Sequence, residues 1–122
     1  VLGGRLCEFS TANLQMKEKL MGLNLNFSSL EENHEEVLEG LQPHANLRWL
    51  RIWSYNGKHL PSWMMKNRLH CFLPNLLRIE IEGADCQLTH LCSFGRLPLL
   101  QHLLLRELNS VEYIEEDEGD AL

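Results

Sequence analysis

Length, composition and charge exclude several classes of protein before any motif is considered. The chain has 122 residues, 44% of them hydrophobic, and its 11 basic and 17 acidic residues give a formal net charge of −6, which is typical of one globular domain. No apolar run approaches the roughly 20 residues of a membrane-spanning helix. Six acids without a base lie between positions 112 and 120, so residues 1–111 have no net charge. They lack the basic surface of a non-specific nucleic-acid binder.

Residues 1–19 are too short for a full structural unit of the kind found further along the chain, although they hold Leu2, Leu6 and Phe9. We interpret them as the remnant of a truncated repeat. Because the chain starts at Val1 rather than at a methionine, we expect it to be a piece of a longer protein. The four cysteines are scattered, which favours reduced thiols in an intracellular, cytoplasmic protein.

Residues 20–111 contain a repeat built on leucine, which occurs 26 times in the chain. The pattern L-x-x-[LI]-x-[LI] begins at Leu20, Leu47, Leu76 and Leu100, with spacings of 27, 29 and 24 residues. These are the spacings of leucine-rich repeats, in which each unit supplies a short strand and a returning arm. Four units satisfy the minimum of three that a stable stack needs.

The arms between the strands are predicted to be mostly irregular. Only residues 34–41 show helical periodicity, and Pro43 follows them. Pro74 and Pro98 each precede a repeat's first leucine by two residues, where a fixed φ sets an extended entry to the strand. Apolar residues of the arms should close the core from the convex side: Val37, Leu38, Leu41, Leu60, Trp63, Met64, Leu88, Leu91, Phe94 and Leu97.

We therefore predict an α/β fold, a leucine-rich-repeat solenoid arc with a parallel concave sheet of about four strands. Side chains alternate along a strand, so Leu50, Ile52, Ile79, Ile81, Leu103 and Leu105 should be buried, while their neighbours point outward. Aligning the repeats gives three outward rows: Gly22, Trp49, Arg78 and His102; Asn24, Arg51, Glu80 and Leu104; and Asn26, Trp53, Glu82 and Arg106.

The outward rows hold the candidate binding residues, because exposed tryptophans beside arginines are typical of protein-binding hot spots. Arg51 should face Glu80, and Glu82 should face Arg106. In the alternative, Trp49 stacks on Arg78 and these charges only satisfy one another. A second candidate surface comprises the loops at the strand exits, Tyr55 to His59 and Asp85 to His90. The predicted protein-binding residues are Trp49, Arg51, Trp53, Arg78, Glu80, Glu82, His102, Leu104 and Arg106.

Residues 112–122 are predicted to be a solvated acidic tail, as blocks of like charge usually are.

Several longer strings carry a family resemblance. Residues 35–44 (EEVLEGLQPH), 46–53 (NLRWLRIW), 60–64 (LPSWM), 73–76 (LPNL), 79–83 (IEIEG), 94–98 (FGRLP) and 110–114 (SVEYI) resemble the leucine-rich repeats of plant NB-LRR disease-resistance proteins of the coiled-coil class. The resemblance implies an intracellular immune receptor whose repeats follow a nucleotide-binding switch domain. Such repeats bind pathogen effectors or guarded host proteins, and they also hold the switch closed.

The sequence does not support a catalytic, metal or cofactor site. The single Gly-Lys pair, Gly57-Lys58, is followed by His59 and lacks the first glycine of a phosphate-binding loop. Cys86, His90 and Cys92 lack a fourth ligand and the spacing of a zinc site. Glu80 and Glu82 are interpreted as a surface pair rather than an acid and base. We predict no catalytic residue, no metal and no cofactor.

These patterns predict a non-enzymatic protein-recognition and regulatory module of a plant immune receptor. Its partner is expected to be an effector, a guarded host protein or the receptor's own nucleotide-binding domain, without nucleic acid or a membrane span. The alternative is a leucine-rich-repeat adaptor, such as the substrate-recognition arm of a ubiquitin ligase. An enzyme is the third hypothesis.

Overall fold

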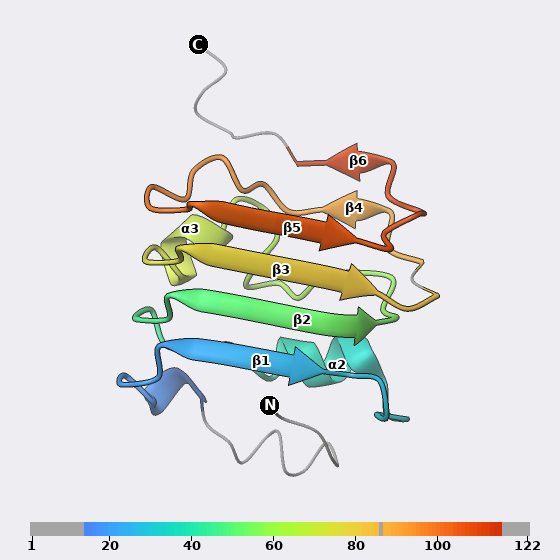
Figure 1. Ribbon diagram of the computed structural model, residues 1–122, viewed down its shortest axis with the longest axis horizontal. Coiled ribbons are helices and arrows are strands. Elements are labelled where there is room, and N and C mark those ends of the chain that lie inside the picture. Colours follow the sequence, from blue (N-terminus) through green and yellow to red (C-terminus); the bar gives the residue numbers. More distant parts are fainter. Residues whose placement is uncertain (1–13, 86, 116–122) are drawn as a thin grey trace.

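The computed structural model describes residues 14–85 and 87–115. Their elements follow in chain order: a 3₁₀ helix η1 (Leu14–Met16), β1 (Gly22–Asn26), α2 (His34–Glu39), β2 (Trp49–Tyr55), α3 (Leu69–Phe72), β3 (Arg78–Gly83), β4 (His90–Leu91), β5 (His102–Arg106) and β6 (Tyr113–Ile114). Figure 1 shows the four longer strands side by side in one sheet.

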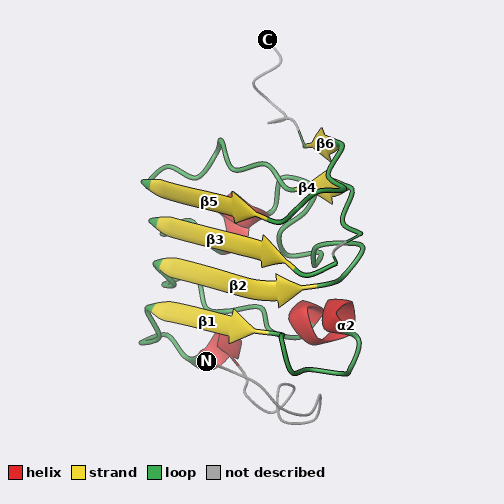
Figure 2. Cartoon of the chain, turned by 45° about the vertical axis from the view of Figure 1, so that its right-hand side comes forward, coloured by secondary structure: helices red, strands yellow, loops and turns green. Residues whose placement is uncertain are grey.

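The main sheet confirms the predicted repeat architecture. Its strand order is β1-β2-β3-β5, and every neighbouring pair is parallel. Each strand is followed by an arm that returns behind the sheet, and α2 lies in the first of these arms (Figure 2). The helices are few and short, so the fold is the predicted α/β leucine-rich-repeat arc.

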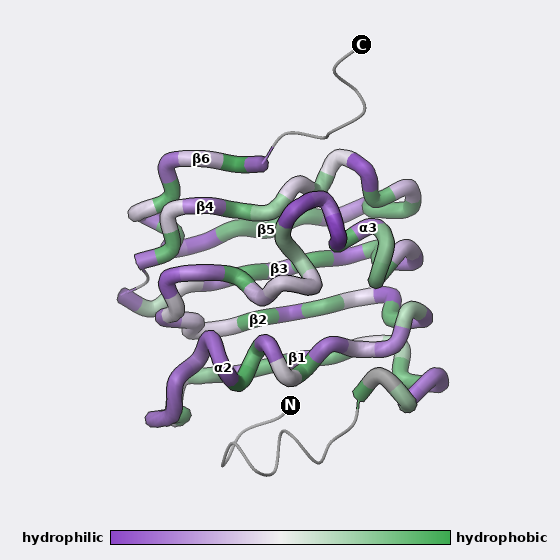
Figure 3. The backbone as a smooth tube through the Cα atoms, turned by 180° about the vertical axis from the view of Figure 1, so that it is seen from behind, coloured by the Kyte–Doolittle hydropathy of each residue, from purple (hydrophilic) through white to green (hydrophobic). Residues whose placement is uncertain are grey.

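The core lies between the sheet and the returning arms. Leu50, Ile52, Ile79 and Ile81 are at most 1% exposed, as alternation along the strands predicts. Seen from behind, α2 and the segment near β4 alternate between hydrophilic and hydrophobic residues (Figure 3). The arm residues predicted to close the core are buried, with Phe94 only partly so: Val37, Leu38, Leu41, Leu60, Trp63, Met64, Leu88, Leu91 and Leu97.

The last repeat departs from the predicted burial. Leu103 is 41% exposed and Leu105 is only partly buried, so the expectation that both are nearly fully buried is wrong. Among the described residues β5 pairs with β3 alone, and no further repeat covers the outer side of its apolar residues. A repeat buries its leucines by stacking between two neighbours, and the last one has a single neighbour.

Short helices differ in detail from the predicted elements. Helix α2 begins at His34, where the Asn33 side chain accepts a hydrogen bond from the Glu36 N–H at 3.0 Å, a standard helix cap. It ends at Glu39 rather than at Leu41, with Gly40 as its C-cap. The turn α3 was not predicted, because four residues are too few to show helical periodicity.

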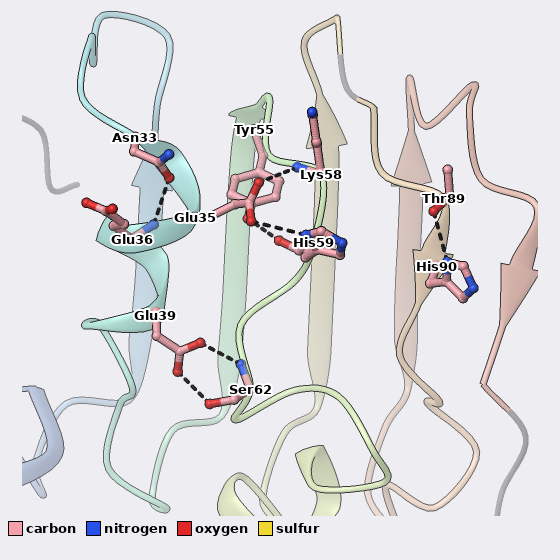
Figure 4. Close-up of polar contacts among 10 residues, drawn as sticks. All are labelled: Asn33, Glu35, Glu36, Glu39, Tyr55, Lys58, His59, Ser62, Thr89 and His90. Atoms are coloured by element: carbon pink, nitrogen blue, oxygen red, sulfur yellow. Dashed lines mark hydrogen bonds and ion pairs between the residues drawn. The ribbon is translucent and has the colours of Figure 1, made fainter.

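Two glutamates of α2 join the first arm to the second. The Glu35 carboxylate accepts from the Lys58 N–H at 2.8 Å and contacts His59 Nδ1 at 3.2 Å. One turn later, Glu39 accepts from the backbone and hydroxyl of Ser62. Figure 4 shows both side chains pointing from α2 toward this loop. These contacts satisfy backbone donors of an irregular arm, which secondary structure leaves unpaired.

A third carboxylate ties the end of the described chain to the same arm. Strands β4 and β6 pair in the returning arms, and Glu115, just after β6, accepts from the Lys66 N–H at 3.0 and 2.7 Å. Lys66 and Asn67 have successive positive φ values of 59° and 56°, a backbone geometry that presents N–H groups to an anion. Residues 112–115 of the expected acidic tail thus pack on the arms, and 116–122 lie outside the described residues, as do residues 1–13.

Candidate protein-binding surface

The outward face of the main sheet carries the predicted rows. Gly22, Trp49, Arg78 and His102 are register partners, as are Asn24, Arg51, Glu80 and Leu104. Parallel neighbours lie about 4.8 Å apart, so both rows are continuous across four strands. Two of the three predicted rows are therefore confirmed.

The third row is interrupted between Trp53 and Glu82. The register of β2 and β3 shifts after Ile52, so that Tyr55 pairs with Gly83. Ser54, with φ 60°, lies within the shift and forms a bulge. The bulge turns Tyr55 into the core, where it is 0% exposed, although simple alternation would place it outward beside Trp53. The predicted pairing of Trp53 with Glu82 is consequently wrong.

Trp49 is the large exposed apolar side chain of this face, with 41% of its surface accessible. Its indole lies over Gly22 of β1, since a Cβ added to Gly22 would fall 1.8 Å from the ring. Only glycine lets the ring lie this close to the backbone. The ring therefore covers β1 rather than stacking on Arg78, and the cation–π contact of this face joins Arg51 to Trp53 at 5.7 Å.

Arg51 and Glu80 form the predicted ion pair. Arg51 Nη2 lies 3.2 Å from Glu80 Oε2, and the two side chains are 34% and 10% exposed. Glu80 as a residue is only 7% exposed, so its carboxylate orients Arg51 and is not itself open to a partner. Within the described residues the Arg51 Nε–H is buried and has no acceptor.

The other predicted residues differ in exposure. Arg78, His102 and Arg106 are exposed, whereas Trp53, Glu82 and Leu104 are half-buried. Glu82 and Arg106 are register partners, as predicted, but the ion pairs among the described residues do not include them. Arg78 and Arg106 thus present exposed positive charge to an incoming molecule, and His102 presents an exposed imidazole.

A groove with a volume of about 580 Å³ crosses one end of this face. It lies where the strands begin, and Trp49, Arg51, Arg78 and His102 line it together with Arg48 and Gln101. Strict alternation did not identify Arg48 and Gln101, because it directs both inward, in phase with Leu50 and Leu103.

The backbone at the strand entries explains the difference. At the start of β2, the N–H groups of Arg48 and Trp49 both donate to the Met21 carbonyl, at 2.7 and 3.1 Å. Leu77 and Arg78 share the Arg48 carbonyl in the same way, and Gln101 and His102 share that of Leu77. One carbonyl that accepts from two successive N–H groups breaks the regular hydrogen-bond ladder. Regular alternation of side chains therefore begins only after the first residue of each such pair.

The loops at the opposite ends of the strands form a second hollow, of about 510 Å³. Asn56, Gly57 and Lys58 line it, and so do Asp85 and Gln87, which belong to the loops named as the alternative surface. Tyr55, from the same stretch, is buried and donates a hydrogen bond to the His59 carbonyl. Gly57 is required there, because a Cβ would come within 2.4 Å of the Tyr55 hydroxyl.

Two ionisable groups have clearly shifted pKa values. Burial raises the pKa of Glu35, but the Lys58 N–H and the His59 side chain lower it by more, so that it lies below its ordinary value of 4.5. Burial raises the pKa of the Cys92 thiol, and the Glu115 carboxylate raises it further. Both groups lie in the returning arms, away from the sheet face. Neither shift therefore points to acid–base chemistry at the candidate surface.

Metal and membrane features were also sought in residues 14–85 and 87–115. They contain no group of three or more His, Cys, Asp or Glu side chains that could hold a metal ion. No helix in them is long and apolar enough to cross a membrane. Cys86 lies outside the described residues, so the predicted absence of a zinc site beside His90 and Cys92 stays a prediction.

Four parallel strands with returning arms and a solvent-facing sheet define a leucine-rich-repeat protein. The family model described as R13L1/DRL21 LRRs matches residues 5–108, and the chain belongs to this family.

Relatives in plants share the same region. The chain is 37% identical over 117 residues to disease resistance protein RGA2 of Solanum bulbocastanum, and 38% identical over 110 residues to putative disease resistance protein RGA1 of the same species. The alignments cover 90% and 87% of this chain but 11% of each relative. No solved structure matches the chain significantly. The predicted resemblance to the leucine-rich-repeat region of plant NB-LRR resistance proteins is confirmed.

Proposed function

We propose that this chain is a non-enzymatic protein-recognition and regulatory module of a cytoplasmic plant immune receptor, and that its partner binds the outward face of the main sheet. The observation that carries the proposal is Trp49, which is 41% exposed on a continuous row of the sheet. Arg78 is its neighbour in that row, and His102 follows Arg78 on the next strand. Repeat proteins bind through such faces, and Trp and Arg dominate binding hot spots.

The geometry supports a preorganised face. Glu80 on the neighbouring strand pairs with Arg51, and the Arg51 guanidinium makes a cation–π contact with Trp53. Side chains fixed before binding lose less conformational entropy when a partner arrives. The partner would be a pathogen effector, a guarded host protein or the receptor's own nucleotide-binding domain.

The test is Trp49→Ala combined with Trp53→Ala in a complete resistance protein that carries this chain. Hot-spot aromatics cost about 2 kcal/mol or more on truncation, roughly 30-fold in affinity, so signalling should change at equal protein abundance. Loss of the response would indicate lost recognition, whereas a constitutive response would indicate lost autoinhibition.

Phe72→Ala is a suitable control, because Phe72 is also exposed, at 38%, but lies in α3 behind the sheet. Unchanged signalling in the double variant would contradict the proposal. The loops at the strand exits would then be the candidate binding surface.

A further inference from the structure

The groove at the strand entries differs in charge from the rest of the molecule. Residues 1–111 have no net charge, yet the residues lining the groove include three arginines and a histidine, and no acid. The three arginines come from two neighbouring strands or their entries, Arg48 and Arg51 from β2 and Arg78 from β3, and His102 of β5 lies beside Arg78. The fold therefore concentrates positive charge that the composition as a whole does not show.

Little of this charge is neutralised from within. Of the groove's three arginines and histidine, only Arg51 has an ion-pair partner among the described residues, and Glu80 contacts it through a single nitrogen, Nη2. Its Nε–H is buried and has no acceptor among the described residues. Arg48 and Arg78 are exposed and take part in no ion pair there. An anion in the groove would give these two arginines charge-assisted hydrogen bonds.

The neighbouring surface limits the size of the anion. Toward the far half of the face, Glu82 of β3 lies beside Arg106, and Asp85 follows the strand. That half therefore lacks the net positive charge that a long polyanion such as a nucleic acid needs. Trp49 forms an apolar wall beside the cations. This combination suits a short peptide segment with two or three carboxylates, because the arginine fork matches carboxylate geometry.

We propose that the groove lined by Arg48, Trp49, Arg51, Arg78 and His102 binds an acidic peptide segment of the partner protein. The inference rests on the proposed function and names the chemistry of the partner at that surface. Arg48 and Arg78 supply the charge-assisted hydrogen bonds, and the partly exposed guanidinium of Arg51 adds positive charge beside them.

The test uses the 122-residue chain and a blocked decapeptide of alternating glutamate and serine, titrated by calorimetry at low and at physiological salt. Arg48→Gln with Arg78→Gln should weaken binding about tenfold or more, and the salt dependence should fall with it. Lys66→Gln with Arg68→Gln removes the same charge from the exposed convex arm, and it should change the affinity less than twofold. Circular dichroism of each variant checks the fold.

Several results would overturn the inference. One is equal binding of the glutamine–serine decapeptide, and another is absence of binding by the acidic one. Tighter binding of a dT decamer would assign the groove to nucleic acid. Binding that appears only after Glu116, Asp117, Glu118 and Asp120 are changed to amides would make the chain's own acidic run the occupant. If the peptide fails while the double tryptophan variant alters signalling, the proposed function stands and only the acidic preference falls.

Discussion

Leu50→Ala should destabilise the chain far more than Leu103→Ala, although the two leucines occupy equivalent positions in their repeats. Leu50 is 0% exposed and lies between Leu23 of β1 and Ile79 of β3. Its truncation leaves a closed cavity, which costs about 3–4 kcal/mol. Leu103 is 41% exposed, and among the described strands its one register partner is Ile79. Water can fill the space that it leaves, so only part of the transfer free energy is lost, about 1 kcal/mol.

Urea unfolding followed by tryptophan fluorescence measures both free energies of unfolding, because Trp63 is only 1% exposed in the folded chain and becomes solvated on unfolding. The slope against urea should be unchanged, so that the midpoint alone reports stability. An equal or larger loss for Leu103→Ala would refute the reasoning, because it would mean that the last repeat is covered on both sides.

Two further predictions concern the arms. Iodoacetamide should modify the exposed Cys71 quickly, while Cys92, which is buried and has a raised thiol pKa, should react only on unfolding. Site-resolved mass spectrometry measures the two rates separately. Equal rates would contradict the difference in burial between the two thiols. The pKa of Glu35 in the folded chain lies below 4.5, so its carboxylate stabilises the fold fully above pH 4.5 and progressively less below it. The difference in unfolding free energy between the wild-type chain and Glu35→Gln should therefore be largest above pH 4.5 and should shrink on acidification. Denaturation curves of both proteins at pH 6, 4.5 and 3.5 test this, and a difference that grows on acidification would reverse the sign of the shift.

The periodic parts of this fold were predictable because one physical rule repeats. Each L-x-x-[LI]-x-[LI] string placed a strand, and its alternation gave the buried positions Leu50, Ile52, Ile79 and Ile81. The same rule predicts Arg51 beside Glu80, and the register and the ion pair confirm it. Register is well determined when one face of a sheet must be buried.

The remaining features depend on local backbone geometry or on neighbours beyond the strand. Ser54 has a left-handed backbone although it is not glycine, so the sequence does not mark the bulge that turns Tyr55 into the core. Arg48 lies in the groove because a carbonyl is shared at the strand entry. Glu80 is buried although its row points outward, and burial of a charge is not visible in a one-dimensional pattern. For the candidate site, strand alternation therefore predicts the face, whereas the groove depends on the shared carbonyls at the strand entries.

The contact of Glu115 with Lys66 and Asn67 has a consequence for how the arc unfolds. In an ideal solenoid each repeat contacts only its neighbours, so stability is a sum of adjacent terms and the ends fray first. Glu115 follows the strand of the last arm but binds the arm that follows β2, so it bypasses the arm that contains β4. Opening the last repeat would also strip an acceptor from two left-handed residues of the second. The stability of the terminal repeat is therefore coupled to that of the second repeat, across the repeat that lies between them.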